Sequence, residues 1–288
     1  MITQISSLSQ KAMLVGITIH AWQARKYDRK ISIEVAEQHA ATNDAGRFNK
    51  HLLPGNAESY EAVHKKAREF RSFYYANTLP WSKDGQRILP TANYETFSEG
   101  VRRFRRELHL LVEQFLTEYP ILKEDARVLL NGMFNEQDYP AIEEMRTKFA
   151  VKVETLPLPS ADDFRVALAE AEVSRIQREI ETRLQREIEN AHRDLWNRLH
   201  NAVDNMVVRL KDPTGKFHDT LVGNLQELVE LIPKLNFTDD RHLESIRLQC
   251  AETLAVHAPQ SLRDDMALRA KVAAQAQEIS AWMDAYMN

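Results

Sequence analysis

Apolar residues recur at helical spacing through a long segment in the second half of the chain. The positions are Val173, Ile176, Ile180, Leu184, Ile188, Ala191, Leu195, Leu199, Ala202, Met206 and Leu210. They cover 37 residues in ten steps, a mean period of about 3.7 residues, and residues 160–212 contain neither glycine nor proline. The pattern predicts one long helix over residues 160–212, which Pro213 and Gly215 stop.

The period of this apolar stripe limits how the helix packs. A left-handed coiled coil needs a repeat of about 3.5 residues, whereas about 3.7 resembles the eleven-residue repeat of straight or slightly right-handed packing. A regular two-stranded coiled coil is therefore disfavoured. Two alternatives remain: a helical hairpin that folds back on its own chain, or a second copy or partner protein along the stripe. We expect the helices after Pro213 to cover it in part, and a partner to bind the uncovered end.

Shorter patterns predict the remaining elements. Helical periodicity predicts helices over residues 31–41, 58–77, 94–119, 121–131, 140–149, 217–232, 240–256 and 261–286. Alternation predicts strands over residues 13–22, 47–53 and 151–156, and prolines bound a loop over residues 78–90 with a turn at its tip. The expected fold is mainly α, a long-helix bundle or helical hairpin with a small α+β N-terminal part of two or three short strands. We expect two lobes, a mixed basic one over 1–158 and an all-α one over 159–288.

Composition supports a helical globular protein. The chain is 43% hydrophobic and 28% charged, with only 8 glycines and 10 prolines in 288 residues. The single cysteine, Cys250, cannot form an intrachain disulfide, which predicts a reducing, cytoplasmic compartment. The longest apolar run, residues 12–19, is far too short to span a membrane, so no membrane association is expected.

Charge is distributed unevenly along the chain. The first 110 residues carry a net charge of +6 and the remainder carries −10, so the basic part is expected to meet an acidic partner or the acidic half of another copy. Its basic residues lie beside aromatic ones, as in proteins that bind nucleic acid, which is the alternative function. The helical spacing of Phe70, Phe73 and Tyr74 also fits a core. The candidate contact residues are Arg25, Lys26, Arg29, Lys30, Lys65, Lys66, Arg68, Arg71, Arg102, Arg103, Arg105 and Arg106.

The sequence contains no specific motif for metal binding or catalysis. Glu61 and His64, like Glu189 and His192, have the i,i+3 spacing of di-iron bundles, but the two further carboxylates of such a site are not identifiable. The sequence has no nucleophile elbow, phosphate-binding loop or dinucleotide-binding turn, and Cys250 fits a small buried side chain. We expect no catalytic residues, metal or cofactor, and predict that the chain is not an enzyme.

The proline-bounded loop carries a tryptophan, which has two interpretations. Leu79 and Trp81 form either an anchor packed onto the core or a docking loop for a partner protein.

Several short motifs resemble one known family. They are Asn77-Thr-Leu-Pro-Trp81 with Asp84-Gly85, Ile88-Leu-Pro90 and Tyr94; Leu130, Met133-Phe134, Asp138-Tyr-Pro140 and Lys148-Phe149; and Pro157-Leu-Pro159 with Asp163-Phe-Arg165 and the long helix. Together they resemble the uncharacterised domain-of-unknown-function family numbered 3150, found in bacteriophages and other mobile elements. Its members are often encoded near a MoxR-type AAA+ ATPase and a von Willebrand A-domain protein, and it has no established active site. The resemblance implies an accessory role in a phage or mobile-element module of the bacterial host cell, as an adaptor or a substrate of the ATPase. The long helix, the uneven charge and the lack of catalytic motifs predict a non-enzymatic scaffold or adaptor that acts through protein–protein contacts, including contacts between copies in a homo-oligomer.

Overall fold

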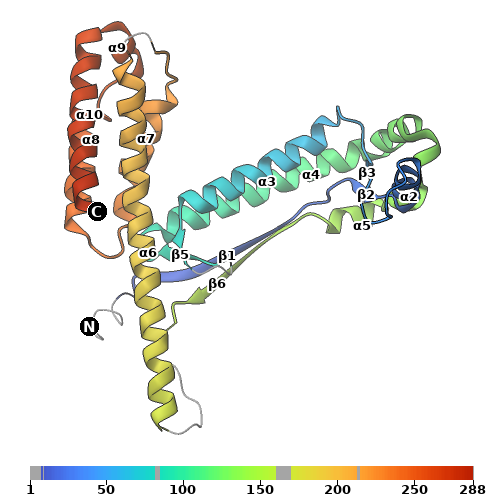
Figure 1. Cartoon of the computed structure of the whole chain (residues 1–288), viewed down its shortest axis with the longest axis horizontal. Helices are drawn as coiled ribbons and strands as arrows, with labels where there is room; N and C mark the ends of the chain where they lie inside the picture. The colour runs from blue at the N-terminus through green and yellow to red at the C-terminus, as the bar shows by residue number, and fades with distance from the viewer. Residues whose placement is uncertain (1–7, 9, 82–84, 160–169, 213–214, 288) are drawn as a thin grey trace. The chain divides into compact units, whose positions relative to one another are not determined.

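The computed structural model describes residue 8 and residues 10–81, 85–159, 170–212 and 215–287. Contacts divide the chain into two compact units. Unit 1 comprises Met1–Gly16, Tyr74–Phe97 and Glu154–Asn288, and unit 2 comprises Ile17–Phe73 and Ser98–Val153. Long helices and a small sheet of short strands make up the fold, which confirms the predicted fold class (Figure 1). No described helix is long and apolar enough to cross a membrane.

Unit 1 is built on the long helix. Helix α6 spans Glu170–Lys211, so the first ten residues of the predicted helix lie outside the described residues. It packs along α7 (Thr220–Leu235) and α10 (Met266–Met287), and α8 (Arg241–Thr253) lies against the same group (Figure 1). The predicted stripe is buried from Leu184 to Leu210, except for the half-buried Ala202. The helical hairpin within the chain is therefore the packing that covers this part of α6.

A buried arginine closes the C-terminal end of α6. Arg269 on α10 donates from Nε to the Leu210 carbonyl at 3.2 Å. Its Nη2 donates to the Arg209 and Gly215 carbonyls at 3.0 and 2.9 Å. The last carbonyls of a helix lack intrahelical partners, and a cation there also opposes the helix dipole. The end of α6 thus depends on a residue from another helix, in addition to the local proline and glycine.

The last predicted helix is divided in two. Residues 261–286 were expected to form one helix, but α9 spans Pro259–Asp264 and α10 begins at Met266. Between them, Asp265 adopts an extended backbone conformation, with φ −110° and ψ 100°. Its carboxylate accepts a hydrogen bond from the Leu268 amide at 2.9 Å, so the aspartate acts as the N-cap of α10.

A four-stranded sheet has the order β4-β5-β1-β6. Its strands are β4 (Leu79–Pro80), β5 (Arg87–Pro90), β1 (Ala12–His20) and β6 (Ala150–Pro157), with β5 antiparallel to both β4 and β1. The predicted strands over 13–22 and 151–156 are confirmed with shifted ends. Strands β4 and β5 were missed because they are too short for a periodic pattern. Gly85, at the tip of the predicted loop, has a φ of +79°, a backbone conformation that favours glycine; residues 82–84 of that tip lie outside the described residues.

The sheet explains why the units differ from the predicted lobes 1–158 and 159–288. Ala12, Leu14, Leu79 and Ile88 belong to the same buried cluster as the α6 stripe. Segments from the first third of the chain therefore group with the C-terminal helices. Unit 1 also contains the short helix η1 (Thr91–Asn93).

Unit 2 is formed mainly by two long helices and a two-stranded ribbon. The helices are α3 (Glu58–Ala76) and α4 (Tyr94–Leu130), and both extend into unit 1 at one end. Strands β2 (Arg25–Tyr27) and β3 (Asn49–His51) pair antiparallel, and the short helices are α2 (Arg29–Gln38), η2 (Asn131–Met133), η3 (Glu136–Asp138) and α5 (Ile142–Thr147). The core of unit 2 includes Leu52, Val63, Phe115, Tyr119 and Met145.

Helix α4 continues through Pro120, whereas two helices over 94–119 and 121–131 were predicted. Proline removes the amide that would bond to the carbonyl of Leu116. Pro120 itself is exposed, whereas Tyr119 and Ala126 on either side of it are buried in the core. Packing of the buried face therefore outweighs the local preference for a helix break.

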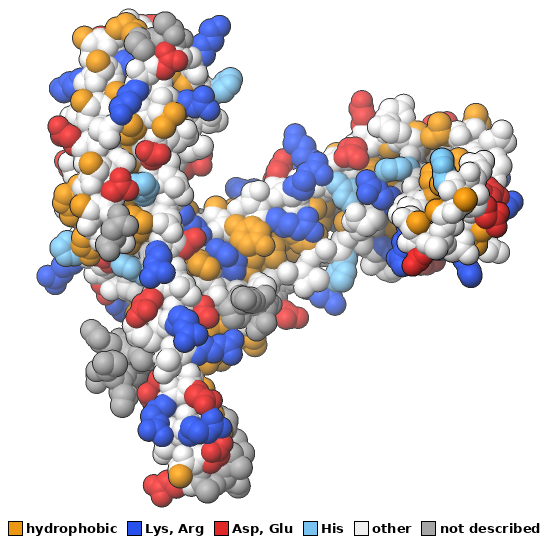
Figure 2. Space-filling view, viewed as in Figure 1, with side chains coloured by type: hydrophobic (Ala, Val, Ile, Leu, Met, Phe, Trp, Pro, Cys, Tyr) orange, Lys and Arg blue, Asp and Glu red, His pale blue; other side chains and the backbone are white. Residues whose placement is uncertain are grey.

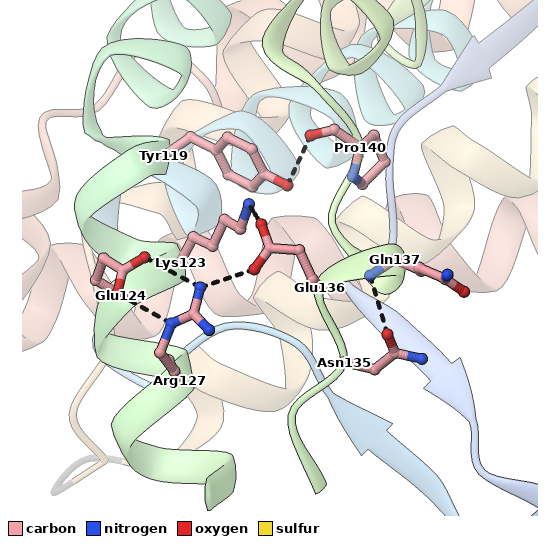
Figure 3. Close-up of polar contacts among 8 residues, drawn as sticks. All are labelled: Tyr119, Lys123, Glu124, Arg127, Asn135, Glu136, Gln137 and Pro140. Carbon is pink, nitrogen blue, oxygen red and sulfur yellow. Dashed lines mark hydrogen bonds and ion pairs between the residues drawn. The ribbon is translucent and has the colours of Figure 1, made fainter.

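A polar network joins the C-terminal part of α4 to the segment that follows it (Figure 3). Glu136 pairs with Lys123 and accepts a hydrogen bond from Arg127 Nη2 at 2.7 Å. Hydrogen bonds from these two cations lower the pKa of Glu136. Tyr119 donates its hydroxyl to the Pro140 carbonyl at 3.1 Å. These contacts fix η3 against α4.

Helices α3 and α4 approach closely at Gly100, and this predicts an unusual effect of alanine. A Cβ atom at position 100 would lie 2.1 Å from Cζ of Phe73, whose ring packs 5.3 Å from the ring of Phe104. Gly100→Ala is expected to lower the free energy of unfolding by about 1–3 kcal/mol through overpacking. Chemical denaturation would measure this change.

Gly223→Ala in α7 provides the matched control. No atom lies within 4 Å of a Cβ built at Gly223, so alanine should raise the free energy of unfolding by about 0.5–1 kcal/mol. If Gly100→Ala were as stable as Gly223→Ala, the close approach of the two helices would be contradicted.

Candidate functional site

The N-terminal part of α6 is the least covered part of this helix. Among the residues that the structure describes, burial on α6 begins at Leu184. The first three positions of the predicted stripe, Val173, Ile176 and Ile180, are only half-buried. Figure 1 shows these first turns extending beyond α7, α8 and α10. The apolar stripe thus continues past the region that the other helices of unit 1 cover.

Ion pairs along this segment support the helix. Arg175 Nε donates to Glu172 Oε2 at 3.1 Å, and the same guanidinium pairs with Glu179. Hydrogen bonds from Arg175 lower the pKa of Glu172, and those to Glu172 raise the pKa of Arg175. Pairs at i,i+3 and i,i+4 stabilise helices that have few tertiary contacts. In Figure 2, basic and acidic side chains lie side by side on this part of α6, at the bottom of the view.

Leu79 and Trp81, the candidate docking residues, lie in the core of unit 1. Leu79 is fully buried and Trp81 is 8% exposed, and both belong to the cluster formed with α6. Arg198 on α6 donates to the Ala76 carbonyl at 2.8 Å and the Thr78 carbonyl at 2.7 Å, which ties this segment to α6. The burial supports the interpretation as an anchor and leaves little of either side chain accessible to a partner.

All twelve candidate basic residues belong to unit 2. Eleven are exposed and one, Lys66, is half-buried between Glu69 and Glu107, with oxygens at 2.6 and 3.1 Å from Nζ. Arg25 and Lys26 lie on β2, Arg29 and Lys30 begin α2, Lys65, Lys66, Arg68 and Arg71 lie on α3, and Arg102, Arg103, Arg105 and Arg106 lie on α4. The structure brings Arg25 and Arg68 to one cavity.

The aromatic residues beside these cations are mostly core. Phe70 and Tyr74 are buried, and the ring of Phe104 lies 5.3 Å from the rings of both Phe70 and Phe73. Lys66 and Arg103 lie over the Phe104 ring, with cations 5.4 and 5.5 Å from its centroid. These rings pack against each other and are not arranged as a platform for stacking bases.

The histidines of the two di-iron-like pairs make structural hydrogen bonds. His64 Nε2 lies 3.0 Å from the Trp22 carbonyl, and His192 Nε2 lies 2.6 Å from Asp240 Oδ2. Asp240 also accepts from Trp196 Nε1 at 2.8 Å and caps the N-terminus of α8. Burial raises the pKa of Asp240, but these hydrogen bonds outweigh it, and the pKa is lowered. Among the described residues, no group of three or more metal-ligating side chains occurs.

Cys250 lies inside the core of unit 1. Burial raises the pKa of its thiol to about 12, so the group stays protonated at neutral pH. A buried, protonated thiol fits the predicted role as a small apolar side chain.

No family model, curated protein or solved structure matches the chain.

Proposed function

We propose that the chain is a non-enzymatic helical adaptor that binds another protein along the N-terminal part of α6. The observation that carries the proposal is the half-buried apolar stripe at Val173, Ile176 and Ile180. An amphipathic helix with anchors at i, i+3 and i+7 is a common way to occupy an apolar groove of a partner. The ion pairs around Arg175 support this helix without neighbouring helices.

The resemblance to the phage and mobile-element family suggests which partners to test. The candidates are a MoxR-type AAA+ ATPase, a von Willebrand A-domain protein, and a second copy of the chain. The adaptor would then act in the cytoplasm of a bacterial host. No cofactor is part of this proposal.

Co-elution with a MoxR-type AAA+ ATPase, the partner that the resemblance suggests, tests the adaptor. We expect the wild-type chain to co-elute with it and Ile176→Glu to lose this association, because a charge would enter the apolar contact. Thr182→Glu adds the same charge on the nearly opposite, exposed face of α6 and should still co-elute. Light scattering on the chain alone tests self-association. If the chain neither co-eluted with the ATPase nor self-associated in these measurements, the proposal would be overturned.

Nucleic-acid binding is the second candidate, favoured by one observation. Arg102, Arg103, Arg105 and Arg106 are all exposed on one short stretch of α4. A mobility-shift assay with single- and double-stranded DNA should show salt-sensitive binding if these residues contact phosphates. Changing all four to glutamate should abolish the shift. Binding that survives this change would exclude the α4 cluster as the contact.

A further inference from the structure

A polar cavity of about 380 Å³ lies within unit 2, between the ribbon β2–β3 and the first turns of α3. Its lining includes Arg25, His51, Tyr60, Glu61, His64 and Arg68. The antiparallel pairing of Arg25 with His51 places the ribbon residues side by side, and the other four come from one face of α3. The volume lies within the range of small-molecule sites, about 300–1,000 Å³.

Two arginines and one carboxylate line the cavity, so cations outnumber anions there. Within the part of the chain that the structure describes, neither Arg25 nor Arg68 forms an ion pair. Other cations of the same unit are paired, such as Lys50 with Asp138 at 2.8 Å. A guanidinium offers parallel N–H donors that match phosphate oxygens. Arg25 on β2 and Arg68 on α3 bring two such groups to the same cavity from separate elements.

Three other lining residues can form hydrogen bonds with hydroxyl groups of a ligand that also carries a phosphate. His64 Nε2 donates to the Trp22 carbonyl, so Nδ1 of the neutral ring is an acceptor. Glu61 supplies a carboxylate, which would repel a bare anion but accepts hydrogen bonds from a sugar hydroxyl. Burial, aided by Glu61, raises the pKa of Tyr60 to about 12, so its hydroxyl stays a donor at neutral pH.

We propose that this cavity binds a phosphate ester that also carries hydroxyl groups, such as a mononucleotide or sugar phosphate. Arg25 and Arg68 hold the phosphate, and Glu61 accepts a hydrogen bond from a hydroxyl of the sugar. The same chemistry occurs in a free small molecule and in the backbone of single-stranded RNA. This site does not depend on the adaptor role of α6.

Isothermal titration calorimetry of the full chain tests the site with three probes: adenosine monophosphate, ribose 5-phosphate and a short oligoadenylate RNA. We expect at least one probe to bind, and Arg25→Gln and Arg68→Gln each to weaken its affinity about tenfold or more, because charged hydrogen bonds are lost. Arg71→Gln is the matched control, since Arg71 is exposed on the same helix but does not line the cavity. It should change affinity less than about twofold.

The three probes also distinguish the two sources of such a phosphate, a free small molecule and an RNA strand. Binding of either small molecule, lost in both cavity variants, supports a free ligand; binding of the RNA alone with the same losses supports a strand. Both arginines are exposed, so thermal melting of the variants should match the wild type and exclude misfolding. Absence of binding to all three probes, or an equal loss in Arg71→Gln, would overturn the proposal.

Discussion

Lys50→Met is expected to lower the free energy of unfolding by about 3–5 kcal/mol, because it removes the buried cation shared by the Asp138 and Asp28 carboxylates and leaves Asp138 with only the longer contact to Lys26 at 3.9 Å. Lys50 on β3 is 6% exposed, and its Nζ lies 2.8 Å from Asp138 Oδ2 and 3.4 Å from Asp28 Oδ2. It also donates to the Met133 carbonyl at 2.8 Å. Burial lowers the pKa of Lys50, but its pairs with Asp138 and Asp28 outweigh this, and the pKa is raised. Urea denaturation measures the loss.

Two variants make this test specific. Lys30→Met removes an 87% exposed side chain that pairs with Glu34 at 3.8 Å, so the free energy should change by less than about 0.5 kcal/mol. Adding Asp138→Asn to Lys50→Met should recover part of the stability, because the Asp138 side chain, 7% exposed, is then neutral. A loss below about 1 kcal/mol for Lys50→Met would contradict the buried network.

The sequence gives no local sign of this network. Lys50 lies between two other polar residues, Asn49 and His51, in the middle of the predicted strand 47–53, and its partners Asp28 and Asp138 are far away along the chain. The spacing of charges along one helix identifies i,i+4 ion pairs. The partners of Lys50 lie in other segments of the chain, so they can be identified only from the tertiary fold. For the same reason, Arg269 on α10 was not identified as a cap for the C-terminal end of α6.

The helices were predicted well because their signal is local. In the stripe from Leu184 to Leu210 an apolar residue recurs every three or four positions, so each helical turn places one on the same buried face. Errors arose where packing opposed a local rule, as at Pro120, or where strands were too short to show alternation, as in β4 and β5.

The candidate sites were predicted only in part. The basic residues were identified from composition, but which cations are paired depends on contacts such as that of Lys66 with Glu107 on another helix. The cavity requires the pairing of β2 with β3, which brings Arg25 near Arg68. An uncovered end of the long helix was expected from the sequence, but which end it is depends on how far α7, α8 and α10 reach along α6, which requires the tertiary fold.

Ile188→Ala is expected to lower the free energy of unfolding by about 2–5 kcal/mol, because it leaves a cavity in a packed core. Ile188 is 6% exposed and belongs to the buried cluster that α6 forms with the other helices of unit 1. Alanine favours helix formation slightly, which offsets only a few tenths of a kcal/mol. Chemical denaturation of the full chain gives the value.

Ile176→Ala is the matched control, since it removes the same atoms from the same stripe three turns earlier, where the side chain is half-buried. The gain in helix propensity is equal at both positions, so the difference between the variants isolates burial. We expect Ile176→Ala to cost less than about 1 kcal/mol. If it cost as much as Ile188→Ala, the chain itself would bury the start of α6, and this surface would be closed to a partner. If only Ile188→Ala is costly, Ile176 contributes little to the stability of the chain, which is what the proposed binding surface requires.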